Sequence, residues 1–114
     1  MVEELLDRGA AKVYATARSP HTPPDRRIVP LALDVTNDHS VAEAAQAATG
    51  VSIVVNNAVI ALNTPVLDAP LADIRAELET NLFGIIRVSR AFAPILAPPP
   101  LQLARQRPVG PVMA

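Results

Sequence analysis

The side chains in this sequence that are best suited to bind a ligand or to react are polar residues that directly follow short apolar runs. Arg18 follows KVYATA, Asp34 follows IVPLAL, and the pair Asn56 and Asn57 follows VSIVV. A guanidinium can pair with phosphate, and a carboxylate or carboxamide can accept hydrogen bonds from a ligand. Each residue also has a purely structural interpretation: a solvated arginine, a turn-forming or helix-capping acid, and asparagines that tie a strand end to its neighbours.

Other reactive groups are sparse. Lys12 and Tyr14, the single lysine and single tyrosine, stand two apart in a predicted strand, so their side chains share a face. His21 and His39 fall in predicted polar loops without a partner, where a surface role is the expectation. No His, Asp and Glu cluster has the spacing of metal ligands, so we predict no metal site.

Composition narrows the class of protein further. The formal net charge is -1 without a basic stripe, which argues against nucleic acid and anionic membranes as partners. No apolar run approaches the length of a membrane helix, and Glu3 and Glu4 stand where a signal peptide would carry bases. The absence of cysteine suits a reducing compartment, so the cytoplasm is the predicted location.

The first third of the chain predicts a helix and two strands. Residues Val2 to Arg8 place apolar side chains on one helical face, and Gly9 supplies a stop. Residues 12–17 then predict a strand. Residues 28–33 predict a second strand, which Pro30 assigns to the edge of a sheet because proline lacks an N–H donor.

The middle of the chain predicts a helix, a strand and a long helix. Ser40 with Glu43 suggests a capping box, although Thr36 or Asp38 could cap instead. Residues 51–55 form a β-branched run typical of a strand buried on both faces. A helix from about 71 to 96 then shows one continuous apolar seam, made of Leu71, Ile74, Leu78, Leu82, Ile85, Ser89, Phe92 and Leu96.

This order of elements predicts an α/β fold with βαβ units around a parallel sheet. Residues 1–97 form the predicted domain. Residues 98–114 contain five prolines and no periodic apolar pattern, so we predict a disordered tail without a strand.

Three separated segments resemble the short-chain dehydrogenase/reductase family over residues 1–97. RGAAKVYATAR is similar to the family's passage from its first helix into its second strand, and Asp34-Val35 to the acidic site after its third strand. VVNNAVIALNTP resembles the Asn-Asn-Ala-Gly motif, and ETNLFGIIRVSRAF the long helix with the family's asparagine. An unrelated α/β binding domain would require these matches to coincide by chance.

The resemblance implies a partial Rossmann-like, doubly wound parallel sheet and a nicotinamide dinucleotide as cofactor, with NADP favoured over NAD. It implies that Arg18 meets the ribose 2′-phosphate, that Asp34 and Val35 contact adenine, and that Asn81 holds a water in the proton relay. The implied cofactor-binding residues are Arg18, Asp34, Val35, Asn56, Asn57 and Ala58. Val59 departs from the motif's glycine, which puts the geometry of that loop in question.

The family's other parts are absent from this sequence. No Gly-rich turn of the kind that holds a pyrophosphate is found among the four glycines, and the Ser, Tyr and Lys partners of Asn81 are missing. We therefore expect a fragment without activity and with doubtful cofactor binding. The abrupt change after Ala97 is what a shifted reading frame or a gene fusion would produce.

The predicted sheet lacks the family's first strand as well as its C-terminal half. In the family order that strand lies between the second and the fourth, so its loss should leave two unpaired inner edges and marginal stability. An alternative function is a non-catalytic module that self-associates or pairs with an intact relative through the helix at 71–96.

Overall fold

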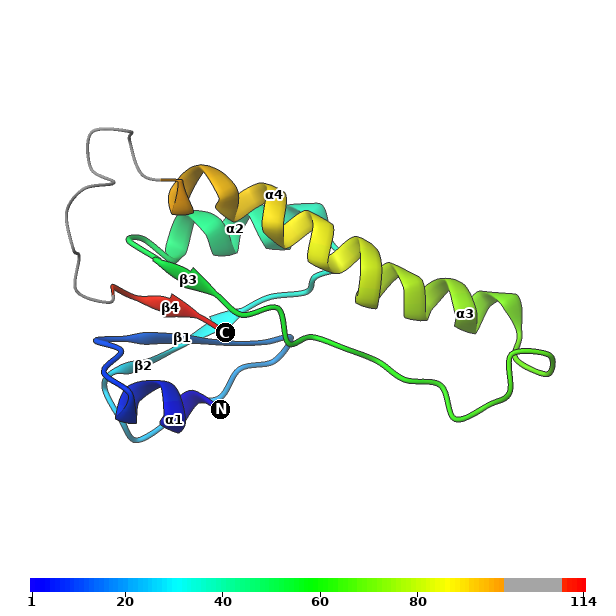
Figure 1. The fold of residues 1–114 in the computed structure, drawn as a ribbon, viewed down its shortest axis with the longest axis horizontal. Coiled ribbons are helices and arrows are strands. Elements are labelled where there is room, and N and C mark those ends of the chain that lie inside the picture. Colours follow the sequence, from blue (N-terminus) through cyan, green and yellow to red (C-terminus); the bar gives the residue numbers. More distant parts are fainter. Residues whose placement is uncertain (98–109) are drawn as a thin grey trace.

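The computed structural model describes residues 1–97 and 110–114, and residues 98–109 lie outside the described part (Figure 1). The predicted disordered tail, residues 98–114, therefore lies mostly outside the described residues. The described elements are α1 (Val2–Asp7), β1 (Val13–Ala17), β2 (Ile28–Ala32), α2 (Asp38–Ala47), β3 (Ile53–Val54), α3 (Leu71–Leu78), η1 (Glu79–Gly84), α4 (Ile85–Leu96) and β4 (Val112–Met113).

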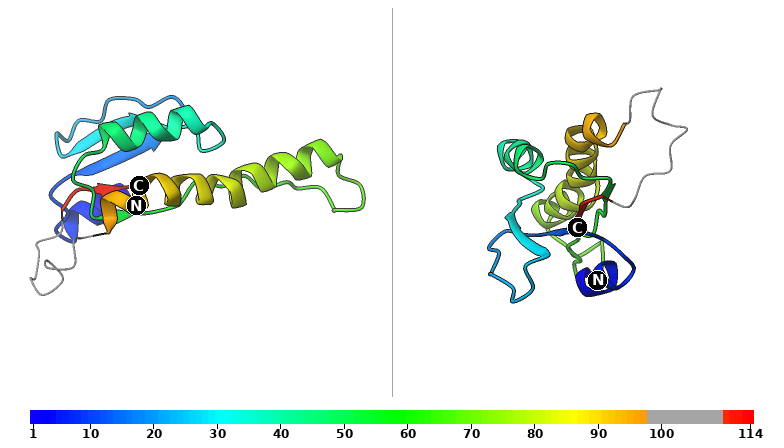
Figure 2. Two further views of the ribbon diagram at one scale, coloured as in Figure 1. Left: turned by 90° about the horizontal axis from the view of Figure 1, so that it is seen from above. Right: turned by 90° about the vertical axis from the view of Figure 1, so that its left-hand side faces the viewer.

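The strands form one parallel sheet in the order β2-β1-β4-β3. Helices α2 and α4 cover one face of this sheet and α1 lies on the other (Figure 2). Three layers with a parallel sheet in the middle define an α/β fold of the doubly wound kind, as the sequence predicted.

Strand β4 corrects the prediction that the sequence after Ala97 contains no strand. Residues Val112–Met113 lie between β1 and β3, with Val112 opposite Val13 on one side and Ile53 on the other. The expected pair of unpaired inner edges is therefore wrong, because this late segment supplies the missing hydrogen-bond partners. Sequence periodicity overlooked it because two apolar residues after a proline carry no repeat.

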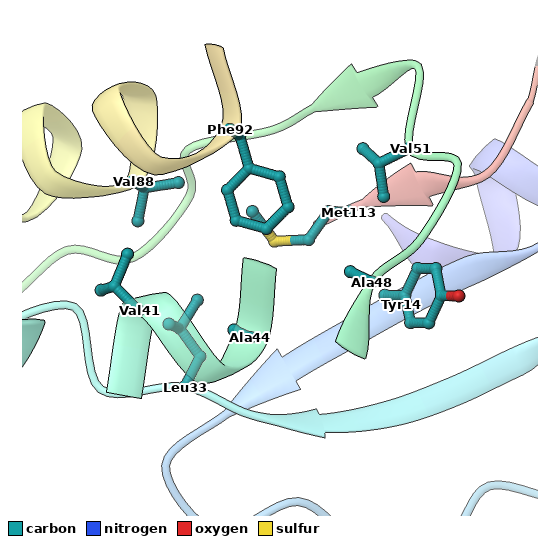
Figure 3. Packing of buried hydrophobic residues seen from close by; sticks show 9 residues of the cluster. All are labelled: Tyr14, Leu33, Val41, Ala44, Ala48, Val51, Val88, Phe92 and Met113. Atoms are coloured by element: carbon teal, nitrogen blue, oxygen red, sulfur yellow. The ribbon is translucent and has the colours of Figure 1, made fainter. Parts of the chain in front are cut away.

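The sheet separates two apolar clusters. The larger cluster lies under α2 and α4 and is shown in Figure 3; its buried members are Tyr14, Leu33, Val41, Ala44, Ala48, Val51, Val88, Phe92 and Met113. The smaller cluster lies under α1 and contains Leu6, Ala10, Val13 and Val112. Neighbouring residues of β4 thus contribute to opposite clusters, as the alternation of side chains along a strand requires.

The two edge strands, β2 and β3, differ in how well they agree with the sequence prediction. Strand β2 lies at an edge with Pro30 in it, which confirms the edge assignment. Strand β3 lies at the other edge and is only two residues long. Because Ile53 is 42% exposed, the prediction of a strand buried on both faces is wrong.

Helix ends follow local chemistry. Gly9 and Gly50 adopt φ of 101° and 72°, so both glycines end their helices in the left-handed region as predicted. The cap of α2 is Asn37, whose side chain accepts from the Ser40 N–H at 3.0 Å, and not any of the three capping residues that the sequence suggested. The Ser40 hydroxyl instead accepts a hydrogen bond from the backbone N–H of Asp34.

The long helix predicted at 71–96 is confirmed as the continuous run α3, η1 and α4 (Figure 1). Its C-terminal half packs on the sheet, with Val88 and Phe92 buried. Its N-terminal half extends past the sheet (Figure 2), so Leu71 is 67% exposed and the predicted seam is buried at one end only. No helix in the described ranges is long and apolar enough to cross a bilayer.

Candidate functional site

Two adjoining hollows open at the carboxyl edge of the sheet, where the strands end and the long helix begins to cross. The first hollow, of about 120 Å³, lies between the end of β4, the segment 55–58 and η1. The second, of about 230 Å³, lies between the end of β1, the segment 33–36 and the segment 58–60. They share Thr16, Leu33, Val35, Ala58 and Thr80, so together they form one cleft.

The structure brings all six predicted cofactor-binding residues to this cleft. Asn56 and Asn57 line the first hollow, Arg18 and Asp34 line the second, and Val35 and Ala58 line both. The side chains come from three chain segments that leave three parallel strands at the same edge. This is the part of an open α/β sheet where ligands bind.

Asp34 is held in a fixed position by the turn that follows β2. Its Oδ1 atom accepts hydrogen bonds from the Thr36 N–H at 2.9 Å and from the Thr36 hydroxyl at 2.6 Å. These two bonds, assisted by the positive charges of Arg18 and Arg87, hold the pKa of the Asp34 carboxyl below its ordinary value. The carboxylate therefore stays ionised at neutral pH and can accept a hydrogen bond from a ligand.

Arg18 follows β1 directly and lines the second hollow together with the segment 58–60. Its charge acts on Asp34 in the same hollow. A guanidinium at this edge offers donors to a phosphate, whereas an acid at the same position would favour free ribose hydroxyls.

Arg87 fastens the segment after β2 to the long helix. Its Nε atom donates to Asp38 Oδ1 at 2.8 Å, a second nitrogen pairs with Glu79, and Nη1 donates to the Val35 carbonyl at 3.4 Å. The two carboxylates raise the pKa of the Arg87 guanidinium further above its ordinary value. Arg87 therefore joins α2 and residue 35 to η1 beside the cleft.

Gly84 allows this close approach. A Cβ atom at that position would lie 2.7 Å from Val35 Cγ2 and 3.1 Å from Val35 Cβ. A valine side chain has little freedom to move aside, because β-branching restricts its rotamers. The glycine therefore lets the helix contact the wall of the cleft.

Asn81 lies within η1, where the helix widens into π geometry. Its Oδ1 accepts from the Ile60 N–H at 2.9 Å, and its Nδ2 donates to the Ile60 carbonyl at 2.7 Å. Both side-chain groups thus hold the loop after Asn57. The predicted role in a proton relay is untested, and the observed role is to position residue 60 at the second hollow.

Val59 replaces the glycine of the family motif without backbone strain. No described residue other than glycine has a positive φ, so the loop takes a path that a β-branched residue can adopt. The Val59 side chain is 70% exposed and lines the second hollow. It therefore adds an apolar wall where glycine would leave space.

Sequence reasoning missed two threonines that line both hollows. Thr16 donates its hydroxyl to the Ala114 carbonyl at 3.0 Å, and Thr80 comes from η1. Thr16 stood inside an apolar run and was assigned only to a strand. Because side chains alternate along a strand, Thr16 shares a face of the sheet with the core residue Tyr14, and this was the signal available in the sequence.

The remaining reactive side chains lie elsewhere. Tyr14 is 5% exposed in the larger core cluster, and Lys12 Nζ lies 5.5 Å from the centre of its ring. His39 is in α2 and pairs with Glu43 at 3.2 Å, so the prediction of a partnerless loop residue is wrong for this histidine. The described residues contain no group of three side chains able to hold a metal ion.

The cleft fits the adenosine end of a nicotinamide dinucleotide better than the rest of it. Arg18 would face a ribose phosphate, Asp34 has an ionised carboxylate, and Val35 and Val59 provide apolar walls for a base. Beside these, the first hollow offers the carboxamides of Asn56 and Asn57 for a ribose. The 114 residues include no Gly-rich turn that would hold a pyrophosphate.

The comparisons with known proteins give the family. A family model described as short chain dehydrogenase matches residues 3–102. Oxidoreductase BOA17 from Botryotinia fuckeliana is 35% identical over 107 residues, which cover 84% of this chain and 39% of that protein. The chain belongs to the short-chain dehydrogenase/reductase family of oxidoreductases.

Solved structures agree with this assignment. A short chain dehydrogenase from Burkholderia cenocepacia, determined in complex with NADP, is 40% identical with a TM-score of 0.72. The match covers 83% of this chain and 40% of that protein. Aldohexose dehydrogenase from Thermoplasma acidophilum is 25% identical with a TM-score of 0.71, over 83% of this chain and 38% of its own. The chain thus spans about two fifths of the length of these relatives.

Proposed function

We propose that the residues lining the cleft form the adenosine-binding part of an NADP-dependent oxidoreductase. The parent enzyme would oxidise an alcohol or reduce a carbonyl. The observation that carries this proposal is the cleft itself. Six residues chosen from sequence, lying in three distant segments, line two adjoining hollows at the carboxyl edge of a parallel sheet. Chance placement of all six in one cleft is a poor explanation.

The preference for NADP over NAD is supported by Arg18. It lines the same hollow as Asp34 and presents a cation where the ribose 2′-position would lie. A guanidinium pairs with a phosphate through two parallel hydrogen bonds. The 40% identical relative whose structure holds NADP is consistent with this choice.

We propose further that these 114 residues do not themselves transfer hydride. When bound, the nicotinamide would supply or accept the hydride, while the protein must place a proton donor at the substrate oxygen. Tyr14 is buried in the core, away from both hollows, and Lys12 is beside it. Asn81 is engaged with Ile60, so its contribution here is to position the loop beside the cleft.

The test of binding uses fragments of the cofactor. Calorimetric titration with 2′-AMP and with 5′-AMP compares two adenosine phosphates that differ in the position of the phosphate. We expect tighter binding of 2′-AMP and loss of that preference in Arg18→Ala, while the exposed Arg90→Ala retains it. Equal binding of the two nucleotides by the unaltered chain would contradict the proposal.

The test of catalysis follows NADPH absorbance in the presence of a panel of aldehydes and ketones. We expect no oxidation above the rate without protein. Turnover that depends on the concentration of this chain would show that the proposed lack of activity is wrong.

A second candidate function, pairing through the long helix, is supported by its exposed apolar side chains. Leu71, Leu78, Leu82 and Ile85 of the predicted seam are 67%, 48%, 49% and 40% exposed. Apolar side chains gathered along one exposed helix mark a contact surface. We propose that a second copy, or an intact relative, covers this part of the helix.

Light scattering coupled to gel filtration tests this pairing. Leu78→Glu should shift the chain from dimer to monomer, and Ala76→Glu, which adds the same charge at another exposed position of α3, should not. A monomeric unaltered chain that also fails to bind an intact relative would remove this candidate.

A further inference from the structure

Strand β4 is bound through its backbone on both sides. Toward β1, the Val112 N–H donates to the Lys12 carbonyl at 3.0 Å and the Ala114 N–H to the Tyr14 carbonyl at 3.0 Å. Toward β3, the Ser52 N–H donates to the Pro111 carbonyl at 2.7 Å and the Val55 N–H to the Met113 carbonyl at 2.7 Å. Without β4, its hydrogen-bonding groups on β1 and β3 would face a gap one strand wide, which we call the slot.

The slot selects side chains as well as backbone. Val112 is 1% exposed in the cluster under α1, and Met113 is 2% exposed in the cluster under α2 and α4. An occupant must thus be extended, parallel to β1 and apolar at two successive positions. A polar residue at either position would be buried without a hydrogen-bond partner, which disfavours its insertion.

The backbone hydrogen-bond partners of β4 all come from the first half of the chain. Among the described residues, its backbone bonds reach residues 12–16 and 52–55 and do not involve α4, the described element before it in sequence. The same bonds can therefore form with a segment from another copy. Exchange of an identical element between copies is a low-cost route to a dimer, because each contact is kept.

We propose that the slot between β1 and β3 accepts residues 110–114 of a second copy, so that two chains exchange β4. Insertion of β4 from the same chain competes with insertion from a second copy, and the effective concentration of a covalently linked segment is typically about millimolar. When chains refold near that concentration, β4 of a neighbouring chain should fill a slot about as often as β4 of the same chain.

The structure offers a direct reporter of which chain fills the slot. A Cβ atom built at Gly110 lies 3.5 Å from Ser52 Cβ, within the range of disulfide-bonded residues. The sequence contains no cysteine, so two introduced thiols are the only ones present. A disulfide within one chain reports its own strand, and a disulfide between chains reports exchange.

The experiment compares a double variant with a mixture of single variants. Ser52→Cys with Gly110→Cys in one chain should oxidise to a monomer at high dilution. Equal amounts of Ser52→Cys and Gly110→Cys chains, refolded together from about 0.01 to 1 mM and then oxidised, should give a cross-linked dimer that increases with concentration. Each single variant refolded alone measures the background of random dimers.

A matched donor identifies the cause of any cross-link. Adding Val112→Asp to the Gly110→Cys chain places a charge in the core position and should abolish the mixed dimer. A double variant that does not close would show that β4 is not in the slot and overturn the proposal. Mixed dimer at the background level, or unaffected by Val112→Asp, would also overturn it. Nucleotide binding is measured separately through Arg18 and the second hollow, which β4 does not line.

Discussion

The replacement of Val112 by alanine tests whether β4 is part of the folded core. Val112 is 1% exposed and packs with Val13, Leu6 and Ala10. The substitution removes two buried carbon atoms at about 0.8 kcal/mol each, and the cavity left behind adds to this loss. We expect the free energy of unfolding to fall by about 2 kcal/mol, equivalent to a decrease in Tm of roughly 10 °C for a domain of this size.

Val66→Ala is the matched control, because it makes the same chemical change at a side chain that is 73% exposed. Urea denaturation followed by circular dichroism gives both free energies. We expect Val66→Ala to lie within about 0.5 kcal/mol of the unaltered chain. If the two variants lose equal stability, β4 does not contribute to the core and the argument is refuted.

Three further changes probe the cleft. Gly84→Ala should lower the free energy of unfolding by about 1 kcal/mol or more, because the new methyl group overlaps the wall of the cleft; thermal unfolding measures it, and an unchanged Tm would contradict the close approach. Thr36→Val removes a hydrogen bond from the Asp34 carboxylate and should raise its pKa toward the ordinary value, as an NMR titration would show. Because the pKa of Asp34 is depressed in the folded chain, the stability that its carboxylate contributes is present above about pH 4 and is lost as the pH falls further. Thr36→Val should therefore lose less stability on acidification than the unaltered chain. An identical dependence of stability on pH would argue against the hydrogen bond. Asn81→Ala breaks both bonds to Ile60 and should speed amide exchange at that residue, whereas unchanged exchange would place the loop's anchor elsewhere.

Much of the fold follows from local pattern. The short run of strand-forming residues at 12–17, the proline in β2 and the periodic helix over 71–96 each predicted the observed element. Gly9 and Gly50 marked helix ends because positive φ favours glycine. The cleft residues were predicted from the resemblance to the family, and they meet because a parallel sheet places the ends of its strands at one edge.

The remaining features depend on contacts between distant residues. Strand β4 is too short to carry a pattern, and its position follows from backbone donors and acceptors that β1 and β3 would otherwise leave unpaired. The exposed half of the long helix was unpredictable because periodicity shows which face is apolar and not what covers it. Asn37 took the cap because Ser40 is engaged with the backbone of Asp34.

We propose that the cleft beside Arg18 and Asp34 recognises an adenosine that carries a 2′-phosphate. Amide chemical-shift mapping of the isotopically labelled chain during titration with 2′-AMP tests it most directly. We predict that the largest shifts fall on residues 16–18, 34–36 and 56–60, which line the two hollows. Shifts confined to other surfaces, or no shifts at saturating nucleotide, would contradict the claim.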